Sequence, residues 1–542
     1  MARRRDGGTA GRAGRALPVA RAHHPFVSTG GGGRRVAGVA GGEQGAGRAV
    51  LPRGIRRYLR LGRAGPGRSS RRARPAARAA GAPVLPRAGP GRAARRPGRP
   101  DRKPAHMSRP VPTRLASTLA ANAHQKEEFQ AFRRRVLEDG EPYVISDAVA
   151  PAEILHAMDI HVTPVVWYSA IIAAKQLSPY YFEQMDARGF HDRLPRYTSL
   201  PLMSTLDGDP ERAPYGGLPK PMMILSRFRD DYGQRISELW SRAYGGVPVF
   251  GLDASSSTAL GPRWWERGLR DWETLYEPHR LDFQVEQLEG LIRTAETLSG
   301  RSFEPLEFMR QMHRINEAGE IVADIRDMLA RARPLPVPLT EQLANVMAPT
   351  WDRGSAWSVA HLKAFRAELR TLIGQGAAAC PNERLRLLWV GNGLWFNTGF
   401  YRAFEEKYGA VFVWTMYSNF LSDGYGRYFR DDPAHALRAL ASRHISMNEQ
   451  LHVPPWMGDW IVEQARAYGA DGAVMLVPKH DRMGSLGSRM TKVALERAGI
   501  PVVELHANMV DARMWDDAAM RKKVEEFIEQ RLLRGSTTTE TA

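Results

Sequence analysis

The chain has 542 residues, enough for two or three domains with a sizeable core, and a formal net charge of +19. Of its 77 basic and 58 acidic residues, 26 and 3 lie in residues 1–106, so that segment carries a net charge of +23 and the remainder −4. The high charge therefore belongs to one tail, and the single cysteine, Cys380, excludes an internal disulfide framework and a metal site built only from this chain's cysteines.

Residues 1–106 are rich in Arg, Gly, Ala and Pro and have no apolar period, a composition that predicts a disordered segment. Three interpretations are open: an arm that binds nucleic acid or an anionic surface, a transit peptide, or translated upstream sequence before a true start at Met107. We favour the third because the composition changes abruptly there. We expect no nucleic-acid partner.

Residues 107–270 predict a first lobe in which strands and helices alternate. The patterns indicate a helix over 118–140, a strand over 143–145, a short helix over 151–158, a strand over 162–167 and a helix over 180–188. A strand over 222–225, a polar loop over 226–231, a helix over 232–244 and a strand over 247–252 complete it as a βαβ unit.

Residues 271–380 predict a helical region, because apolar residues recur at helical spacing from Phe283 to Leu298 and from Phe308 to Leu329. The proline-rich turn at 334–338 interrupts it.

Residues 381–535 predict a second lobe, with a short tail over 536–542. Strands are expected over 385–390, 411–414, 472–477 and 502–505, and helices over 398–408, 459–468, 488–498 and 516–533. The predicted class is therefore α/β, with two doubly wound lobes and a helical middle region. No run of about 18 apolar residues predicts a membrane span, and the lone cysteine fits a cytoplasmic location.

Polar side chains at predicted strand ends are the candidates for chemistry, because open parallel sheets bind ligands at the carboxyl ends of their strands. Arg227 and Asp230 follow a strand of the first lobe, and Lys479 and His480 follow one of the second. A solvated charged turn is the alternative for each stretch. Gly391-Asn392-Gly393 is a weak dinucleotide signal and is better explained as a tight turn.

Aromatic residues cluster near the second lobe's first strand, among them Trp395 and Phe396. Core packing is one interpretation, and an apolar pocket for an acyl or aryl group is the other. We take Trp167, Tyr168, Trp395, Phe396 and Lys479 as substrate-binding candidates, and Asp230, Arg227 and His480 as catalytic candidates.

Over residues 125–535 the chain resembles the benzoyl-CoA reductase / 2-hydroxyacyl-CoA dehydratase family, most closely the B-type subunit of benzoyl-CoA reductase. The segments that carry the resemblance are Pro164–Tyr168, Leu194–Tyr197, Gly216–Pro221, Glu238–Trp240, Gly393–Asn397 and Ala507–Arg513. The resemblance implies two Rossmann-like (flavodoxin-like) lobes with a helical insert. It also implies a heterodimeric enzyme acting on aryl- or 2-hydroxyacyl-CoA thioesters, such as those of aromatic degradation, with an ATP-hydrolysing iron–sulfur activator as electron donor.

Such a family also implies a [4Fe–4S] cluster held by three cysteines at strand ends. The matching positions here fall near Thr198, at Asp230 and at or next to Gly484, and none of them is cysteine. A cubane needs soft thiolates, so we expect this chain to bind no cluster by itself and a partner subunit to carry it.

Two hypotheses remain. In the first, the chain is a cluster-free subunit that shapes the acyl-CoA site and docks onto a homologous subunit that keeps its cysteines. In the second, the fold serves redox-independent CoA-thioester chemistry or a structural, binding role. We favour the first.

Overall fold

The computed structural model of the chain describes residues 109–110, 114–191, 194–228, 231–253, 261–449, 456–481, 485 and 487–534. The chain divides into residues 1–53 and 54–542, and every described residue lies in the second unit. The predicted tails 1–106 and 536–542 lie outside the described residues. The predicted domain bounds stay predictions.

The first lobe contains a sheet of four parallel strands in the order β3-β2-β4-β5. Its strands are β2 (Tyr143–Ser146), β3 (His161–Pro164), β4 (Met223–Phe228) and β5 (Val249–Asp253). The predicted βαβ unit is confirmed, because α7 (Asp231–Ala243) connects β4 to the adjacent parallel strand β5.

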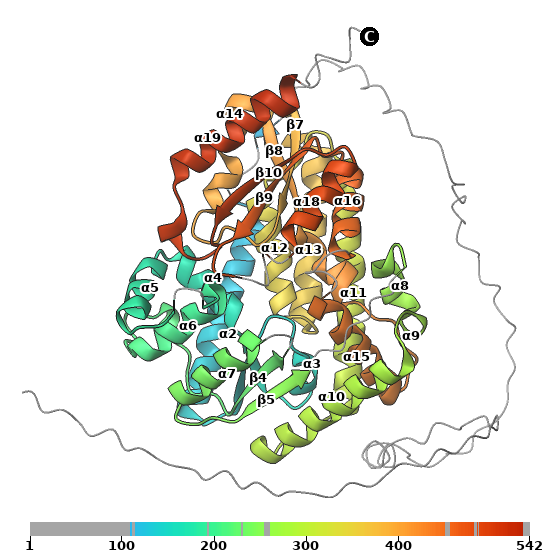
Figure 1. The fold of residues 1–542 in the computed structure, drawn as a ribbon. Coiled ribbons are helices and arrows are strands. Elements are labelled where there is room, and N and C mark those ends of the chain that lie inside the picture. The colour runs from blue at the N-terminus through green and yellow to red at the C-terminus, as the bar shows by residue number, and fades with distance from the viewer. Residues whose placement is uncertain are drawn as a thin grey trace, which may run out of the picture. The chain divides into compact units, whose positions relative to one another are not determined.

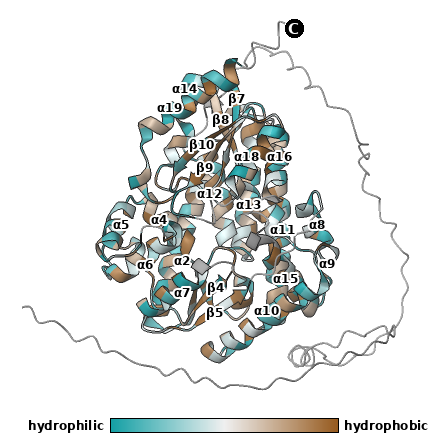
Figure 2. Ribbon diagram, in the orientation of Figure 1, coloured by the Kyte–Doolittle hydropathy of each residue, from teal (hydrophilic) through white to brown (hydrophobic). Residues whose placement is uncertain are grey.

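The second lobe contains a sheet of four parallel strands in the order β10-β9-β7-β8. Its strands are β7 (Leu385–Val390), β8 (Ala410–Thr415), β9 (Gly472–Pro478) and β10 (Val502–Ala507). Every residue of β7 and β8 is buried, as expected for parallel strands covered on both faces. In Figure 1, α14 (Glu405–Tyr408) and α19 (Asp517–Phe527) lie on one side of this sheet, and α16 (Trp456–Tyr468) and α18 (Ser488–Arg497) on the other. Figure 2 shows the sheet as mainly hydrophobic and α19 as alternating between hydrophilic and hydrophobic residues.

The two sheets repeat one strand order. In each, the lobe's first strand lies between its second and its third, so the chain changes winding direction at β2/β4 and again at β7/β9. This is the start of the flavodoxin-like order, in which ligands bind beyond the carboxyl ends of the strands at such a switch point. The predicted α/β class with two lobes is confirmed.

The remaining elements cover the sheets or form the helical middle region. In the first lobe these are α2 (Ala116–Glu138), α3 (Ala152–His156), α4 (Val165–Ala174), α5 (Ser178–Ala187), α6 (Arg196–Asp207) and the 3₁₀ turn η1 (Pro214–Gly216). After α8 (Trp264–Arg270), the middle region holds α9 (Trp272–Leu275), α10 (Pro278–Ser299), α11 (Pro305–Arg331), α12 (Leu339–Trp351) and α13 (Ala356–Gly374); the helical spacing predicted α10 and α11. A short parallel pair joins β1 (Arg109–Pro110) to β6 (Ala377–Ala378). The second lobe adds α15 (Pro433–Glu449) and the short turns η2 (Thr398–Arg402), η3 (Met416–Asn419), η5 (Ala512–Met514) and η6 (Ile528–Leu533).

Three predicted elements are wrong in part. The strand predicted over 162–167 ends at Pro164, and the apolar residues after it begin helix α4; a short apolar run does not distinguish a buried strand from a buried helix. The polar loop predicted from Ser226 is instead strand as far as Phe228, and Arg227 pairs with Leu252 of β5. The helix predicted over 398–408 is broken into η2 and α14.

A π-helical turn, η4 (Phe420–Tyr425), follows β8 and η3 and packs against α11. The backbone carbonyl oxygen of Leu421 approaches Gly319 of α11 so closely that a Cβ there would lie 3.0 Å from it. The small residue therefore permits the close packing of the two helices.

A buried ion-pair triad connects the first lobe, the middle region and the second lobe. Glu153 of α3 is fully buried and accepts hydrogen bonds from Arg353 Nε (2.7 Å) and from Arg443 Nη1 and Nη2 (2.8 and 2.6 Å). Both guanidiniums stack over the ring of Tyr425, at 4.8 and 5.3 Å. Burial alone would raise the pKa of Glu153, but the two guanidiniums outweigh it and hold the pKa well below its usual range.

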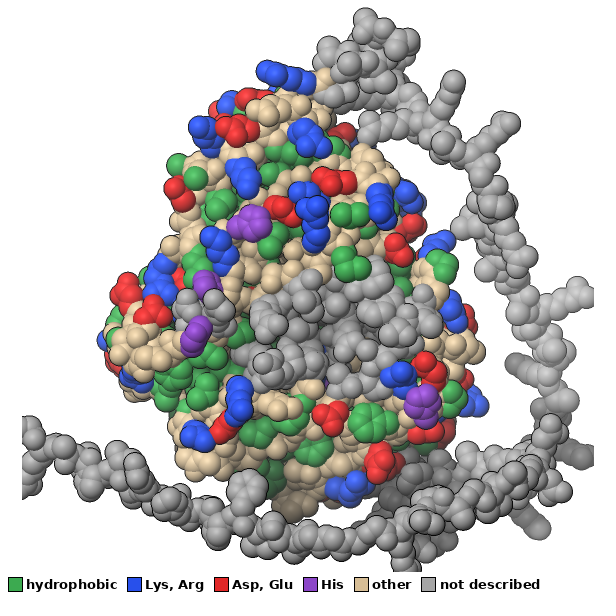
Figure 3. Space-filling view, viewed as in Figure 1, with side chains coloured by type: hydrophobic (Ala, Val, Ile, Leu, Met, Phe, Trp, Pro, Cys, Tyr) green, Lys and Arg blue, Asp and Glu red, His purple; other side chains and the backbone are tan. Residues whose placement is uncertain are grey.

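Within the described residues, no helix is long and apolar enough to cross a membrane. On the face seen in Figure 3, hydrophobic side chains gather near α6, while charged side chains of both signs are spread over the upper part.

We predict that Glu153→Gln lowers the free energy of unfolding by about 3–5 kcal/mol, because it leaves two buried guanidiniums without a counter-charge. Urea unfolding at pH 7 measures this. Since the folded pKa of Glu153 is depressed, the wild type should lose this contribution as the pH falls below about 4.3, and the variant should lack that loss.

The matched control is Glu238→Gln on the exposed face of α7, where Glu238 pairs with Arg242 and Arg235. An exposed pair contributes little, so this variant should unfold close to the wild type. Equal unfolding midpoints for the two variants would contradict the role of the triad.

Candidate functional site

One cavity of about 170 Å³ lies where the carboxyl ends of both sheets meet. Its wall includes residues at or after β2 and β4 of the first sheet and residues at or after β7 and β9 of the second. The cavity therefore touches the switch points of both sheets, the position at which open α/β folds bind ligands.

Much of the cavity wall is apolar. Four methionines, Met347, Met416, Met457 and Met475, line it together with Val166 and Phe420. Thioether side chains are flexible and polarisable, and they make favourable contacts with aromatic rings. The wall can therefore adapt to an apolar group of uneven shape.

An ion pair stands at the first sheet's switch point. Asp147, directly after β2, accepts hydrogen bonds on Oδ2 from the Arg227 backbone N–H (3.1 Å) and from Arg227 Nε (2.7 Å). Its Oδ1 accepts from the backbone N–H of Val149 (3.0 Å), which fixes the loop. The side chain of Arg227 is 6% exposed and that of Asp147 is 22% exposed, so the pair is a partly buried polar point on the wall.

The wall also carries two tyrosines. Tyr197 lies in the first turn of α6 and Tyr417 lies in η3, and both are buried and line the cavity. Asp481, beyond the end of β9, also lines it and is buried. The ring of Trp395 lies 5.4 Å from that of Tyr417.

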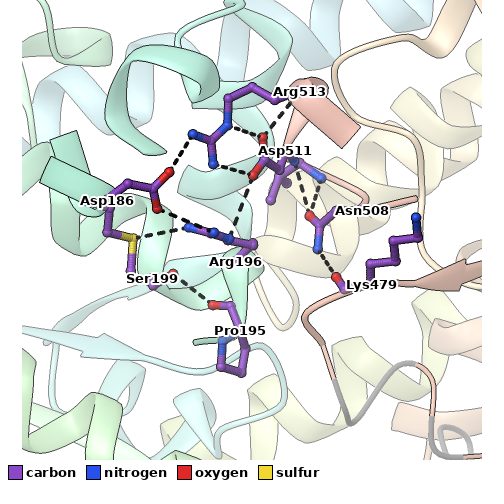
Figure 4. A network of polar contacts seen from close by, with 10 residues as sticks. Asp186, Pro195, Arg196, Ser199, Lys479, Asn508, Asp511 and Arg513 are labelled. Atoms are coloured by element: carbon purple, nitrogen blue, oxygen red, sulfur yellow. Dashed lines mark hydrogen bonds and ion pairs between the residues drawn. The ribbon is translucent and has the colours of Figure 1, made fainter. Parts of the chain in front are cut away.

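A polar network beside this wall joins the two lobes (Figure 4). Asp511, which is fully buried, accepts hydrogen bonds from Arg513 Nε and Nη2 (2.9 and 2.8 Å), and Arg196 Nε lies 3.7 Å from its Oδ2. Asp186 of α5 accepts from Arg513 Nη1 at 2.8 Å. Segments 194–197 and 507–513, which carry the family resemblance, therefore meet each other across the lobes.

The predicted catalytic residues do not all come together. Arg227 lies on the cavity wall, while Asp230 lies outside the described residues. His480 is half-buried with φ 55°, a conformation uncommon for a residue with a side chain, and does not line the cavity. Of the positions matched to cluster ligands, Thr198 lines the cavity and Gly484 lies outside the described residues.

None of the five predicted substrate-binding residues lines the cavity itself. Trp167 and Tyr168 belong to α4, but the residue of this helix that lines the cavity is the preceding one, Val166. The Tyr168 hydroxyl donates a hydrogen bond to Pro214 O at 2.7 Å. Trp395 contacts Tyr417, and Phe396 contacts Trp515, with ring centroids 6.0 Å apart. Lys479 has an exposed side chain, and its main-chain oxygen accepts from Asn508 (2.7 Å). The roles proposed for these residues stay predictions.

Residues 147–530 match the family model described as 2-hydroxyglutaryl-CoA dehydratase, D-component. The chain belongs to this family. It is also 21% identical over 403 residues to the (R)-2-hydroxyisocaproyl-CoA dehydratase alpha subunit of Clostridioides difficile, a match that covers 74% of this chain and 92% of that protein.

The residues at the cavity do not fit the [4Fe–4S] cluster that the resemblance implies. The sulfurs on the cavity wall are methionine thioethers, whereas such clusters are held by thiolates. Cys380 precedes β7, whose six residues separate it from the cavity by roughly 20 Å at the usual rise of a strand. Burial raises the pKa of its thiol, and its Sγ donates to Asn382 Oδ1 at 2.9 Å.

Sequence reasoning missed Asp147, Tyr197, Tyr417 and Asp481 as cavity residues. A usable signal existed for Asp147 and Asp481, because each follows a predicted buried strand within four residues of its predicted end. Tyr197 lies inside a segment that carried the resemblance, but only the fold shows that it faces Tyr417 of the other lobe.

His444 of α15 is a further buried polar group, and it lies near Arg227. It is 2% exposed, and neither ring nitrogen has a hydrogen-bond partner within the part of the chain that the structure describes. Burial and the nearby Arg227 lower its pKa to about 3, so the imidazole is neutral at pH 7.

We predict that His444→Leu leaves stability at pH 7 unchanged or higher, because an unpaired buried imidazole contributes an unmatched desolvation cost. The unfolded histidine binds a proton below about pH 6.5 and the folded one does not, so wild-type stability falls as the pH decreases from there towards 3. Between pH 7 and pH 5 the variant should lose about 2 kcal/mol less than the wild type.

Urea unfolding at both pH values measures this difference. The matched control is His506→Leu, since the side chain of His506 is 49% exposed. A loss of more than about 2 kcal/mol for His444→Leu at pH 7 would mean that its nitrogens are in fact paired.

Proposed function

We propose that this chain is a cluster-free subunit of a 2-hydroxyacyl-CoA dehydratase-type enzyme and that it binds the acyl part of a CoA thioester. The observation that carries the proposal is the cavity that touches the switch points of both sheets, in a chain of the D-component family. Polar groups at strand ends, Arg227 with Asp230 and His480, are the proposed sites of hydrogen bonding or proton transfer.

The cavity's size and lining support an acyl or aryl group of about six carbons. An engineered apolar cavity of about 150 Å³ in another protein accommodates benzene, and this cavity has about 170 Å³. The curated relative is named for a 2-hydroxyisocaproyl group, which has six carbons and a branched end. The methionines favour an aromatic ring equally well, so an aryl-CoA substrate is part of the proposal. Kinship with the B-type subunit of benzoyl-CoA reductase is proposed on the same ground.

The proposed partner is a homologous subunit that keeps its cysteines and carries the [4Fe–4S] cluster, with an ATP-dependent iron–sulfur activator. The lack of cysteines at this cavity motivates it, and the curated relative is named as an alpha subunit of a dehydratase. The alternative, redox-independent CoA-thioester chemistry or a structural role, predicts that this chain acts without a partner or a reductant.

Calorimetric titration of the purified chain tests the acyl site. We expect isocaproyl-CoA and benzoyl-CoA to bind at least about tenfold more tightly than free CoA, because the acyl group buries apolar surface in the cavity. Val166→Phe should remove this difference, because the larger ring fills cavity space, while free CoA should bind as before.

Val462→Phe makes the same change at a half-buried position of α16 that does not line the cavity, and should bind as the wild type does. If the wild type holds acyl-CoA and free CoA equally well, the cavity is not the acyl site.

Co-expression tests the partner. Produced anaerobically with a cysteine-bearing homologous subunit, the chain should co-purify with it in a defined ratio, and the iron should follow the partner when the two are separated. Iron retained by this chain alone in a ratio of four per chain would contradict the proposed division, and acyl-CoA turnover by this chain alone without reductant would favour the alternative.

A further inference from the structure

Two phenol groups from different lobes meet on the cavity wall. Tyr197 comes from the first turn of α6 and Tyr417 from the turn after β8, and their hydroxyl groups interact with each other. Each is held by its surroundings: the Ser169 hydroxyl donates to the Tyr197 carbonyl, and the backbone N–H of Gly393 reaches the Tyr417 hydroxyl. The pair is therefore a fixed feature of the wall.

Hydrogen-bond donors are in excess around this pair. The buried Trp395 Nε1–H is directed at the Tyr197 hydroxyl, whereas the buried hydroxyl of Thr198, which lines the same cavity, has no partner among the described residues. Burial raises the pKa of both tyrosines, so each phenol keeps its proton at neutral pH. Buried donors without acceptors are uncommon in folded proteins, so the cluster indicates a missing acceptor.

The charges nearby restrict what that acceptor is. Asp481 lies close enough to raise the pKa of both tyrosines further, and Asp147 also lines the cavity. The guanidinium of Arg227 is already paired with Asp147. A carboxylate ligand would meet like charge here, whereas a neutral carbonyl oxygen would accept from a phenol without that cost.

We propose that Tyr417, which accepts a hydrogen bond from the Tyr197 hydroxyl, donates its own O–H hydrogen bond to the thioester carbonyl oxygen of an acyl-CoA bound in this cavity, and that Tyr197 positions it. The inference rests on the proposed function and assigns the polar contact within that same site. Fixed donors aimed at a carbonyl oxygen stabilise negative charge that develops on it. The two tyrosines would thus set both the position of the acyl group and the polarity of its carbonyl.

The test compares three ligands by calorimetric titration of the full chain. Isocaproyl-CoA has the carbonyl, S-(4-methylpentyl)-CoA has a methylene in its place, and 2-hydroxyisocaproyl-CoA adds a hydroxyl group. We expect the wild type to bind the thioester about 5- to 10-fold more tightly than the thioether, and Tyr417→Phe and Tyr197→Phe each to reduce that ratio towards one.

Unchanged binding of the thioether by each variant shows that the cavity is intact, and it serves as the folding control. Tyr468→Phe is the matched variant, because the Tyr468 hydroxyl is buried, has no partner among the described residues and does not line the cavity. It should keep the wild-type ratio.

The outcomes are distinguishable. If the wild type binds thioester and thioether equally but both more tightly than free CoA, the phenols do not recognise the carbonyl, although the acyl site stands. If the tyrosine variants weaken only 2-hydroxyisocaproyl-CoA, the contact belongs to the hydroxyl group and the proposal is overturned. If no acyl-CoA binds better than free CoA, the proposed function fails and this inference fails with it.

Discussion

The constraint on which the structure depends is the burial of one carboxylate, Glu153, between two guanidiniums. A buried charge is tolerated only with a partner, so α3, the turn after α12 and helix α15 must come together around it. Arg353 also donates to Ala150 O at 2.6 Å, which ties the triad to the loop after β2. That loop carries Asp147, and so the polar wall of the cavity is positioned by a charge cluster several residues away.

The cavity combines two kinds of polar surface on an apolar background. At the first sheet's switch point a carboxylate and a guanidinium neutralise each other, whereas elsewhere the wall presents the phenols of Tyr197 and Tyr417 with Asp481 nearby. Methionine and other apolar side chains line much of the space between them. Such a site favours a ligand with an apolar body and one neutral acceptor, and it disfavours a small free anion.

Local pattern was sufficient for much of the fold. β7 was predicted with the bounds that the structure has, because its residues are uniformly apolar apart from Arg386 and are followed by glycine. Helix α4 was missed, since its apolar residues continue directly from β3 without a polar break. The site was harder to predict: Arg227 was identified as a strand-end charge, but its partner Asp147 and the pairing of Tyr417 with Tyr197 depend on contacts between residues distant in sequence. Arg196 and Asp511 are 315 positions apart, and no local period reports such a pair.

The π-helical turn η4 has two sides with different neighbours. Phe420 and Tyr425 line the cavity between the lobes, whereas Ser422 and Asp423 line a separate pocket formed with α8 and α11. There Asp423 accepts from Arg326 (3.1 Å) and from Trp460 Nε1 (2.8 Å). A π turn holds one residue more than an α-helical turn would. The additional residue lets this one turn supply Phe420 and Tyr425 to the cavity and Ser422 and Asp423 to the pocket, and loss of one residue would leave an α-helical turn with one side chain fewer for these two sides.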